Sequence, residues 1–160
     1  MANKLVAFFS ASGVTKHLAQ NLAKAADADV YEIKPAKAYS NEDLNWLDNN
    51  SRSSLEMKDP NSRPEIVDDN FSIKNYDVVF LGFPIWWYIA PTIVNTFLEK
   101  HDFSNKKIIL FATSGGSSLG RTIDNIKKSV PDSCEVVSGM VLNPDYSTEE
   151  LSKWVGSLKL

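Results

Sequence analysis

Three segments of this 160-residue chain combine small, hydroxyl-bearing or aromatic residues in ways that could hold an anion and a flat ring. The first is "SASGVT", residues 10–15, which follows the apolar run "KLVAFF". Between a strand and a helix, such residues offer backbone N–H groups and hydroxyls to a phosphate, and the helix N-terminus adds positive potential. Because Lys16 is the single cation that follows the segment, the N–H groups, the hydroxyls and the helix N-terminus would have to stabilise most of a phosphate's negative charge. Taken alone, the segment is equally compatible with an ordinary serine-capped turn.

The second and third segments also come directly after apolar runs. Residues 84–91, "PIWWYIAP", place Trp86, Trp87 and Tyr88 after a predicted buried strand. Three consecutive aromatic side chains cannot all face the same way, so we expect one to pack inward and at least one to face a flat ligand. Residues 113–120, "TSGGSSLG", are small enough for a backbone to approach a ring edge closely.

The elements that must position these segments alternate between strands and helices. Continuous apolar runs predict buried strands, and an alternating run predicts an edge strand. The buried strands are expected at 4–9, 77–83, 106–113 and 134–142, and the edge strand at 29–35. Helices are expected over 14–26, after Pro91, over 119–130, and from Ser147, which begins a capping-box pattern with Glu150. This alternation predicts right-handed βαβ units and an open, doubly wound parallel sheet, since a closed barrel would need many more residues.

The long crossover over residues 36–76 departs from this regular alternation. We expect one helix at 43–57, entered through Ser40-x-x-Asp43 and ended by "DPNSRP". Its apolar stripe is thin, which predicts a loosely packed cover and not a second domain. The whole chain, 1–160, is therefore predicted to be a single domain.

The bulk composition excludes several classes of protein. A hydrophobic content of 43%, a charged content of 23% and a net charge of −3 are typical of a globular protein without a basic tract. We therefore expect no nucleic-acid partner and no membrane insertion. The single Cys134 excludes an internal disulfide, and together with the lack of a signal-peptide pattern it predicts a cytoplasmic protein without a metal site.

The chain resembles flavodoxins of the short-chain type across essentially its whole length, and these three segments carry the resemblance. "SASGVT" resembles the Ser/Thr-x-Ser/Thr-Gly-x-Thr phosphate loop, "LGFPIWW" the first flavin loop, and "ATSGGS" the second flavin loop. The resemblance implies an α/β fold, a flavodoxin-like three-layer α/β/α sandwich. Its five-stranded parallel sheet would have the order 2-1-3-4-5, and FMN would bind where strands one and three meet.

The resemblance also implies which residues bind the cofactor FMN, with Trp86 or Trp87 stacking on the flavin. The implied cofactor-binding residues are Ser10, Ala11, Ser12, Gly13, Val14, Thr15, Pro84, Ile85, Trp86, Trp87, Thr113, Ser114, Gly115, Gly116 and Ser117. No catalytic residue and no metal ligand is implied, because the flavin supplies the redox chemistry.

The function implied by the resemblance is electron transfer by bound FMN, with redox partner proteins or a small quinone-like acceptor. An FMN-dependent NAD(P)H:quinone-type oxidoreductase on the same fold is the alternative. One-electron carriers of this family rotate a peptide of the first flavin loop with the help of a glycine, and residues 84–91 contain none. A third possibility is an interaction module without flavin, against which the intact "SASGVT" argues.

Two other motifs overlap the third segment. "GGSSLGRT", residues 115–122, nearly matches a phosphate-binding P-loop, but Arg121 replaces the required lysine. "GSSLG" matches the nucleophile elbow of hydrolases with Ser118 at its centre, but both His17 and His101 precede Ser118, contrary to that family's order. We therefore expect neither an NTPase nor a serine hydrolase.

Overall fold

One parallel sheet with helices on both faces forms the centre of the computed structural model, which describes residues 3–11, 13–67, 70–86, 89–113, 121–142 and 145–160. Within these residues five strands follow the order β2-β1-β3-β4-β5, which confirms the predicted fold class. The strands are β1 (Lys4–Phe8), β2 (Asp29–Glu32), β3 (Val78–Pro84), β4 (Lys107–Thr113) and β5 (Glu135–Val141). The helices are α1 (Val14–Ala26), α2 (Arg52–Lys58), α3 (Thr92–Lys100), α4 (Thr122–Lys127) and α5 (Thr148–Ser157).

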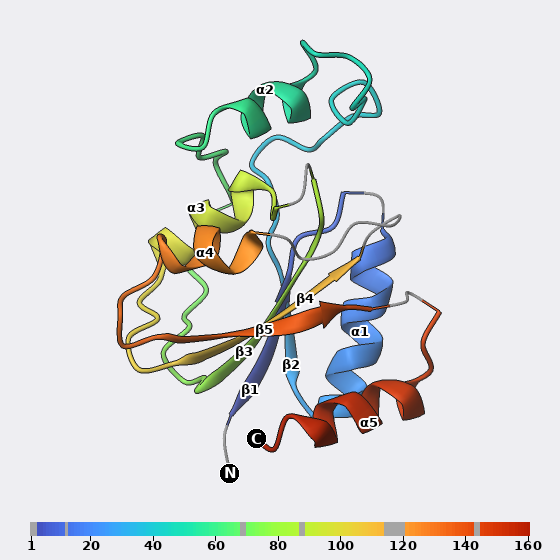
Figure 1. Cartoon of the computed structure of the whole chain (residues 1–160), viewed down its shortest axis with the longest axis vertical. Helices are drawn as coiled ribbons and strands as arrows, with labels where there is room; N and C mark the ends of the chain where they lie inside the picture. Colours follow the sequence, from blue (N-terminus) through green and yellow to red (C-terminus); the bar gives the residue numbers. More distant parts are fainter. Residues whose placement is uncertain (1–2, 12, 68–69, 87–88, 114–120, 143–144) are drawn as a thin grey trace.

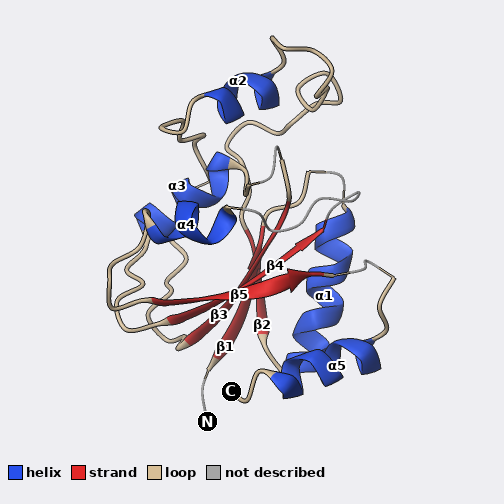
Figure 2. Cartoon of the chain, in the orientation of Figure 1, coloured by secondary structure: helices blue, strands red, loops and turns tan. Residues whose placement is uncertain are grey.

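The helices divide into two layers around the sheet. Figures 1 and 2 show α1 and α5 against one face, α3 and α4 against the other, and α2 apart from both, beyond one end of the sheet. Successive β1 residues serve opposite layers: Ala7 packs in the cluster under α3, and Phe8 in the cluster under α1 and α5. The two apolar faces explain why the strand sequences are continuously hydrophobic. Among the described helices, none has the length and apolar composition that crossing a bilayer would require.

Helix α1 has the predicted bounds, and one of its faces is buried. The buried residues are Thr15, Leu18, Ala19, Leu22, Ala23 and Ala26. These follow the i, i+3, i+4, i+7 spacing of one helical face. Val14, a predicted cofactor-binding residue, is 43% exposed, and the buried face begins at Thr15.

The cover helix predicted at 43–57 is wrong in its first half, because α2 begins only at Arg52. Ser40 and Asp43 do form the expected pair of reciprocal side-chain bonds, each 3.0 Å long. The helix does not continue, since Asn45 Oδ1 accepts from the N–H of Leu47 and Asp48 Oδ1 accepts from the N–H of Asn50. Asn and Asp side chains compete in this way with helical hydrogen bonds, and so residues 41–50 form turns.

Two further elements are shorter than predicted. The edge strand predicted at 29–35 ends at Glu32, and Pro35 instead forms an antiparallel bridge with Ile66. The helix predicted at 119–130 is observed from Thr122 to Lys127, and residues 119–120 lie outside the described residues. Beyond Lys127 the chain tightens into a turn, in which the N–H of Ser129 donates to the Ile126 carbonyl.

The β4–β5 pairing contains a bulge that requires a glycine. Ile109 pairs with Val137 and Phe111 with Met140, so a single β4 residue, Leu110, faces two residues of β5. A Cβ added at Gly139 would lie 1.6 Å from the Leu110 carbonyl oxygen. Only glycine lets the two backbones approach this closely.

We therefore expect Gly139→Ala to lower the free energy of unfolding by at least about 2 kcal/mol, because the clash is with backbone that cannot move aside. Urea denaturation followed by circular dichroism measures the change. Gly156→Ala is the matched control, since an added Cβ there meets nothing within 4 Å inside α5. That variant should be neutral or more stable by about 0.5–1 kcal/mol. Equal unfolding free energies for the two variants would contradict the bulge assignment.

Candidate functional site

Thr113, the last residue of β4, joins the described ends of the three predicted segments. Its hydroxyl lies 2.8 Å from the hydroxyl of Thr15, and its carbonyl accepts a 3.0 Å bond from the N–H of Ile85. Thr15 and Thr113 are 2% and 6% exposed, so both groups are shielded from water. The segments therefore meet at the carboxyl end of the parallel strands, where such sheets bind ligands.

The N-terminus of α1 provides backbone donors at this edge. Gly13, the residue before α1, has φ +92°, a left-handed conformation that favours glycine, and it has no side chain of its own with which to cap the helix. The N–H of Gly13 donates to Ser10 Oγ over 3.0 Å, which leaves the Ser10 hydroxyl proton for an outside acceptor. By contrast, Ser147 caps α5 through a complete capping box. The first-turn N–H groups of α1 thus fit an anion.

Side-chain charge contributes little at this helix end. The first turn of α1 carries no acidic residue that would repel an anion. The Lys16 ammonium, the cation that follows residues 10–15, lies 3.5 Å from the Glu32 carboxylate and forms an ion pair with it. An anion here would therefore be held by N–H groups and hydroxyls, as the sequence predicts.

One residue of the aromatic segment packs inward, as expected. Trp86 is half-buried and meets Phe9 and Tyr39 edge to face, at ring-centroid distances of 5.7 and 5.6 Å. Its backbone exchanges hydrogen bonds of 2.9 and 3.2 Å with Ile89. Edge-to-face packing of this kind fixes a ring in place. The other candidate for stacking on a flavin, Trp87, lies outside the described residues.

Tyr39, from the cover segment, is a site neighbour that sequence reasoning missed. Its hydroxyl donates to Glu56, and the Arg52 guanidinium lies 3.8 Å above its ring. Arg52 also donates to Glu56 over 2.9 Å and to the Lys37 carbonyl over 2.7 Å. Burial, together with the bond to Glu56, raises the pKa of Tyr39 well above its usual range. The one available signal was the i, i+4 spacing of Arg52 and Glu56.

The other predicted site residues divide between described and undescribed positions. Ala11, Pro84 and Ile85 are half-buried at this edge, and His17 is exposed beside Asn21. The predicted residues Ser12, Trp87, Ser114, Gly115, Gly116 and Ser117 lie outside the described residues, as does Ser118. In the part of the chain that the structure describes, no three His, Cys, Asp or Glu side chains gather to hold a metal.

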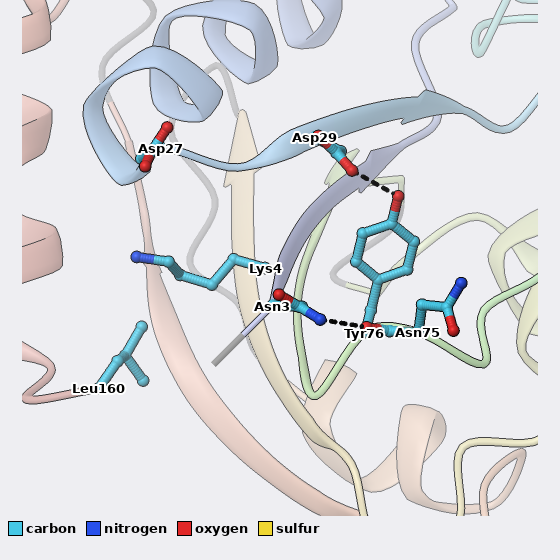
Figure 3. Close-up of a pocket in the computed structure, with 7 residues that line it drawn as sticks. All are labelled: Asn3, Lys4, Asp27, Asp29, Asn75, Tyr76 and Leu160. Atoms are coloured by element: carbon cyan, nitrogen blue, oxygen red, sulfur yellow. Dashed lines mark hydrogen bonds between the residues drawn. The ribbon is translucent and has the colours of Figure 1, made fainter. Parts of the chain in front are cut away.

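A separate hollow of about 510 Å³ opens at the opposite edge of the sheet, at the amino ends of β1 and β2. Figure 3 shows Tyr76 turned toward Asp29, to which its hydroxyl donates over 2.7 Å. This bond raises the pKa of Tyr76 to about 12. Lys4 and Asp27 also line the hollow. Because it lies at the other end of the strands, the hollow does not belong to the candidate site.

We expect the Thr15–Thr113 bond to show up as a coupling between two variants. Thr15→Val and Thr113→Val should each cost about 1–3 kcal/mol of unfolding free energy, because each orphans a buried hydroxyl. The double variant should cost less than the sum, by about 1 kcal/mol, in urea denaturation of the cofactor-free protein.

Thr122→Val is the control for this measurement. Thr122 is fully buried, and its hydroxyl has no hydrogen-bond partner within the described structure. Its replacement by valine should therefore be neutral or stabilising. Strictly additive losses at Thr15 and Thr113 would mean that their bond contributes nothing.

Known proteins resemble this chain in sequence and in fold. Among curated proteins, a flavodoxin-like domain-containing protein, BilS from Clostridioides difficile, is 31% identical over 109 residues. That match covers 66% of this chain and 61% of BilS, so the chain spans about three fifths of this relative. NAD(P)H dehydrogenase [quinone] 1 from Rattus norvegicus is 31% identical over 81 residues, which cover 41% of this chain and 30% of that enzyme.

Solved structures match over the whole chain. A structure described as that of a candidate flavoprotein from Bacteroides eggerthii is 41% identical, with a TM-score of 0.88 over 100% of this chain and 99% of that one. A Lactobacillus acidophilus flavoprotein in complex with FMN has the same fold, with 23% identity and a TM-score of 0.69 over 96% and 99% of the two chains. The sequence profile of the flavodoxin family matches residues 3–158. This chain therefore belongs to the flavodoxin family.

Proposed function

We propose that this protein binds FMN at the edge of the sheet formed by the three segments and transfers electrons through it. The observation that carries the proposal is the meeting of these segments at Thr113, beside the uncapped N-terminus of α1. The Ser10–Thr15 segment would hold the phosphate, and residues 84–87 and 113–117 would flank the flavin ring. The flavin, when bound, supplies the redox chemistry.

Within this site each described group has a separate task. The Ser10 hydroxyl and the first-turn N–H groups of α1 bind the phosphate, and Gly13 keeps its surroundings open. Thr113 holds the first two segments together through its hydroxyl and carbonyl. Trp86 already packs edge to face against Phe9 and Tyr39, and so we assign stacking on the flavin ring to Trp87.

The proposal predicts that the protein prefers FMN over riboflavin. Riboflavin lacks the phosphate, and each lost charge-assisted bond is worth about 1.5–3 kcal/mol. We therefore expect riboflavin to bind a few orders of magnitude more weakly in titrations of the cofactor-free protein, followed by tryptophan fluorescence. FAD should also bind more weakly, because a helix N-terminus shaped for a terminal phosphate has no evident place for an adenylate.

Two serine variants sharpen this test. Ser10→Ala should weaken FMN binding about tenfold and leave riboflavin binding nearly unchanged, because the variant removes a phosphate donor. Ser152→Ala is the control, since Ser152 is exposed on α5, away from the site. Equal affinities of the wild type for FMN and riboflavin would refute a phosphate site.

A second candidate function is an FMN-dependent oxidoreductase that transfers electrons between NAD(P)H and a quinone. The quinone dehydrogenase relative supports it, and so does the absence of glycine from residues 84–91. Without a glycine, turning a peptide of this segment into the left-handed region costs roughly 1–3 kcal/mol. This cost works against the stepwise, one-electron behaviour of a carrier.

The two functions differ in how the loaded protein is reduced. The conformational cost above lowers the equilibrium population of the half-reduced flavin by up to about a hundredfold. We therefore expect the reduction potentials of the two one-electron steps to lie close together. During photoreduction, absorbance spectra should then pass from oxidised to fully reduced with a single set of isosbestic points. Two well-separated steps would instead favour a one-electron carrier and leave the FMN site itself unaffected.

A further inference from the structure

A cleft of about 640 Å³ lies next to the loop that follows β3. The cover segment lines it with Asn61 and Arg63, and the loop contributes Ile89. Its other wall is α4 with its flanking residues, which contribute Arg121, Asp124 and Lys128. The cleft is therefore lined by three cations and a single carboxylate.

The charged wall of the cleft is set by how α4 packs. Arg121, Asp124 and Lys128 are spaced i, i+3 and i+7, which places them on one side of a helix. On the other side, Thr122 and Ile126 are completely buried. Because those two residues fix the rotation of α4, the side chains at 121, 124 and 128 must face outward into the cleft.

Arg63 is already paired within the protein. Its Nε lies 2.9 Å from the Glu99 carboxylate, and the guanidinium also donates to the carbonyls of Pro60 and Ser62. The bond from Arg63 holds the pKa of Glu99 below its usual value, so the pair stays ionised at neutral pH. Arg63 therefore forms a fixed edge of the cleft with most of its charge compensated.

Arg121 and Lys128 differ from Arg63 in this respect. Among the ion pairs of the described residues, none includes either side chain. Set against Asp124, they leave one excess positive charge in the cleft, although the whole chain carries a net charge of −3. Positive charge concentrated in a concave site of an acidic protein attracts small anions.

The cleft also adjoins the proposed flavin site. Ile89, which lines it, exchanges both backbone hydrogen bonds with Trp86. A molecule seated in the cleft would thus lie beside the segment that flanks the flavin. An anionic group held by Arg121 and Lys128 would leave the remainder of that molecule next to the flavin loop.

We propose that this cleft binds the phosphate or acid group of a small organic anion that exchanges electrons with the bound flavin. The inference rests on the proposed function and names the chemical class of its substrate. A guanidinium and an ammonium together suit a phosphate, a sulfonate or a carboxylate. For a quinone acceptor, two electrons and two protons pass from the reduced flavin to the quinone, which becomes a hydroquinone. The cleft takes no part in that step and only positions the molecule.

The test compares quinones with and without an anionic group. Calorimetry on the FMN-loaded protein measures the binding of 1,4-naphthoquinone-2-sulfonate and of uncharged 2-methyl-1,4-naphthoquinone. The double variant Arg121→Gln/Lys128→Gln should bind the sulfonate about tenfold more weakly and the uncharged quinone unchanged. Asp124→Asn should act in the opposite direction and tighten sulfonate binding severalfold, because it removes the opposing charge.

The control is Lys100→Gln/Lys127→Gln, which removes two charges from exposed positions on α3 and α4 outside this cleft. A twofold change or less is expected, and a loss equal to that of the cleft variant would overturn the proposal. Comparing NADPH with NADH then identifies the source of the anion. If the double variant Arg121→Gln/Lys128→Gln loses affinity tenfold for NADPH alone, the cleft binds a dinucleotide phosphate. If it loses affinity for the sulfonate alone, the cleft binds an acidic acceptor.

Two further outcomes decide the matter. The proposal is wrong if the wild type binds every anionic probe with a Kd above about 10 mM. It is also wrong if the double variant binds these probes with the same affinity as the wild type. The FMN titration is a separate readout: a protein that fails to bind FMN refutes the proposed function. In that case the same probes, titrated against the cofactor-free protein and its variants, still test the cleft.

Discussion

The buried hydroxyl pair of Thr15 and Thr113 is the contact on which the geometry of the site depends. It lies between the first turn of α1 and the last residue of β4, two elements that are 98 positions apart in the sequence. The Thr113 carbonyl then fixes Ile85 at the start of the second segment. Because a buried hydroxyl without a partner is costly, this bond keeps the first and third segments together, and the bond from the Ile85 N–H to the Thr113 carbonyl ties the second segment to the third. These contacts would keep the proposed phosphate site and the proposed ring site at a constant distance from each other.

In the cover segment, Tyr39 links helix α2 to the end of the sheet. Helix α2 contributes little apolar burial, since its buried residues are Ser53 and Ser54 and Leu55 is 53% exposed. Its connection to the sheet runs through Tyr39, whose ring contacts both Phe9 and Trp86. The bonds among Tyr39, Arg52 and Glu56 satisfy the polar groups that this packing buries. The position of Trp86 is therefore coupled to the fold of a distant crossover.

Strong local sequence patterns made the fold predictable, but contacts between residues distant in the sequence could not be predicted from such patterns. Helix α1 and the Ser147 cap of α5 follow from short-range spacing, and the buried strands from continuous apolar runs. The cover helix was predicted too long because Asn45 and Asp48 hold turns that a capping pattern does not reveal. The three predicted segments do meet at one end of the sheet, but the role of Thr15 in joining them depends on a partner 98 residues away. The inward packing of Trp86 likewise depends on Tyr39, which no local signal connects to it.

The cations around the candidate site fall into two groups. Lys16 is paired with Glu32, Arg52 with Glu56, and Arg63 with Glu99, so these three cations are compensated within the protein. A phosphate at the N-terminus of α1 would thus be bound by dipoles, which exert a short-range field and discriminate by shape. Arg121 and Lys128 line the cleft next to the proposed flavin segment and take part in none of the ion pairs among the described residues. Dipoles suit a cofactor that stays bound, because their geometry is fixed. Exposed, flexible cations suit a ligand that must enter and leave, since in contact with water each contributes only modest binding energy.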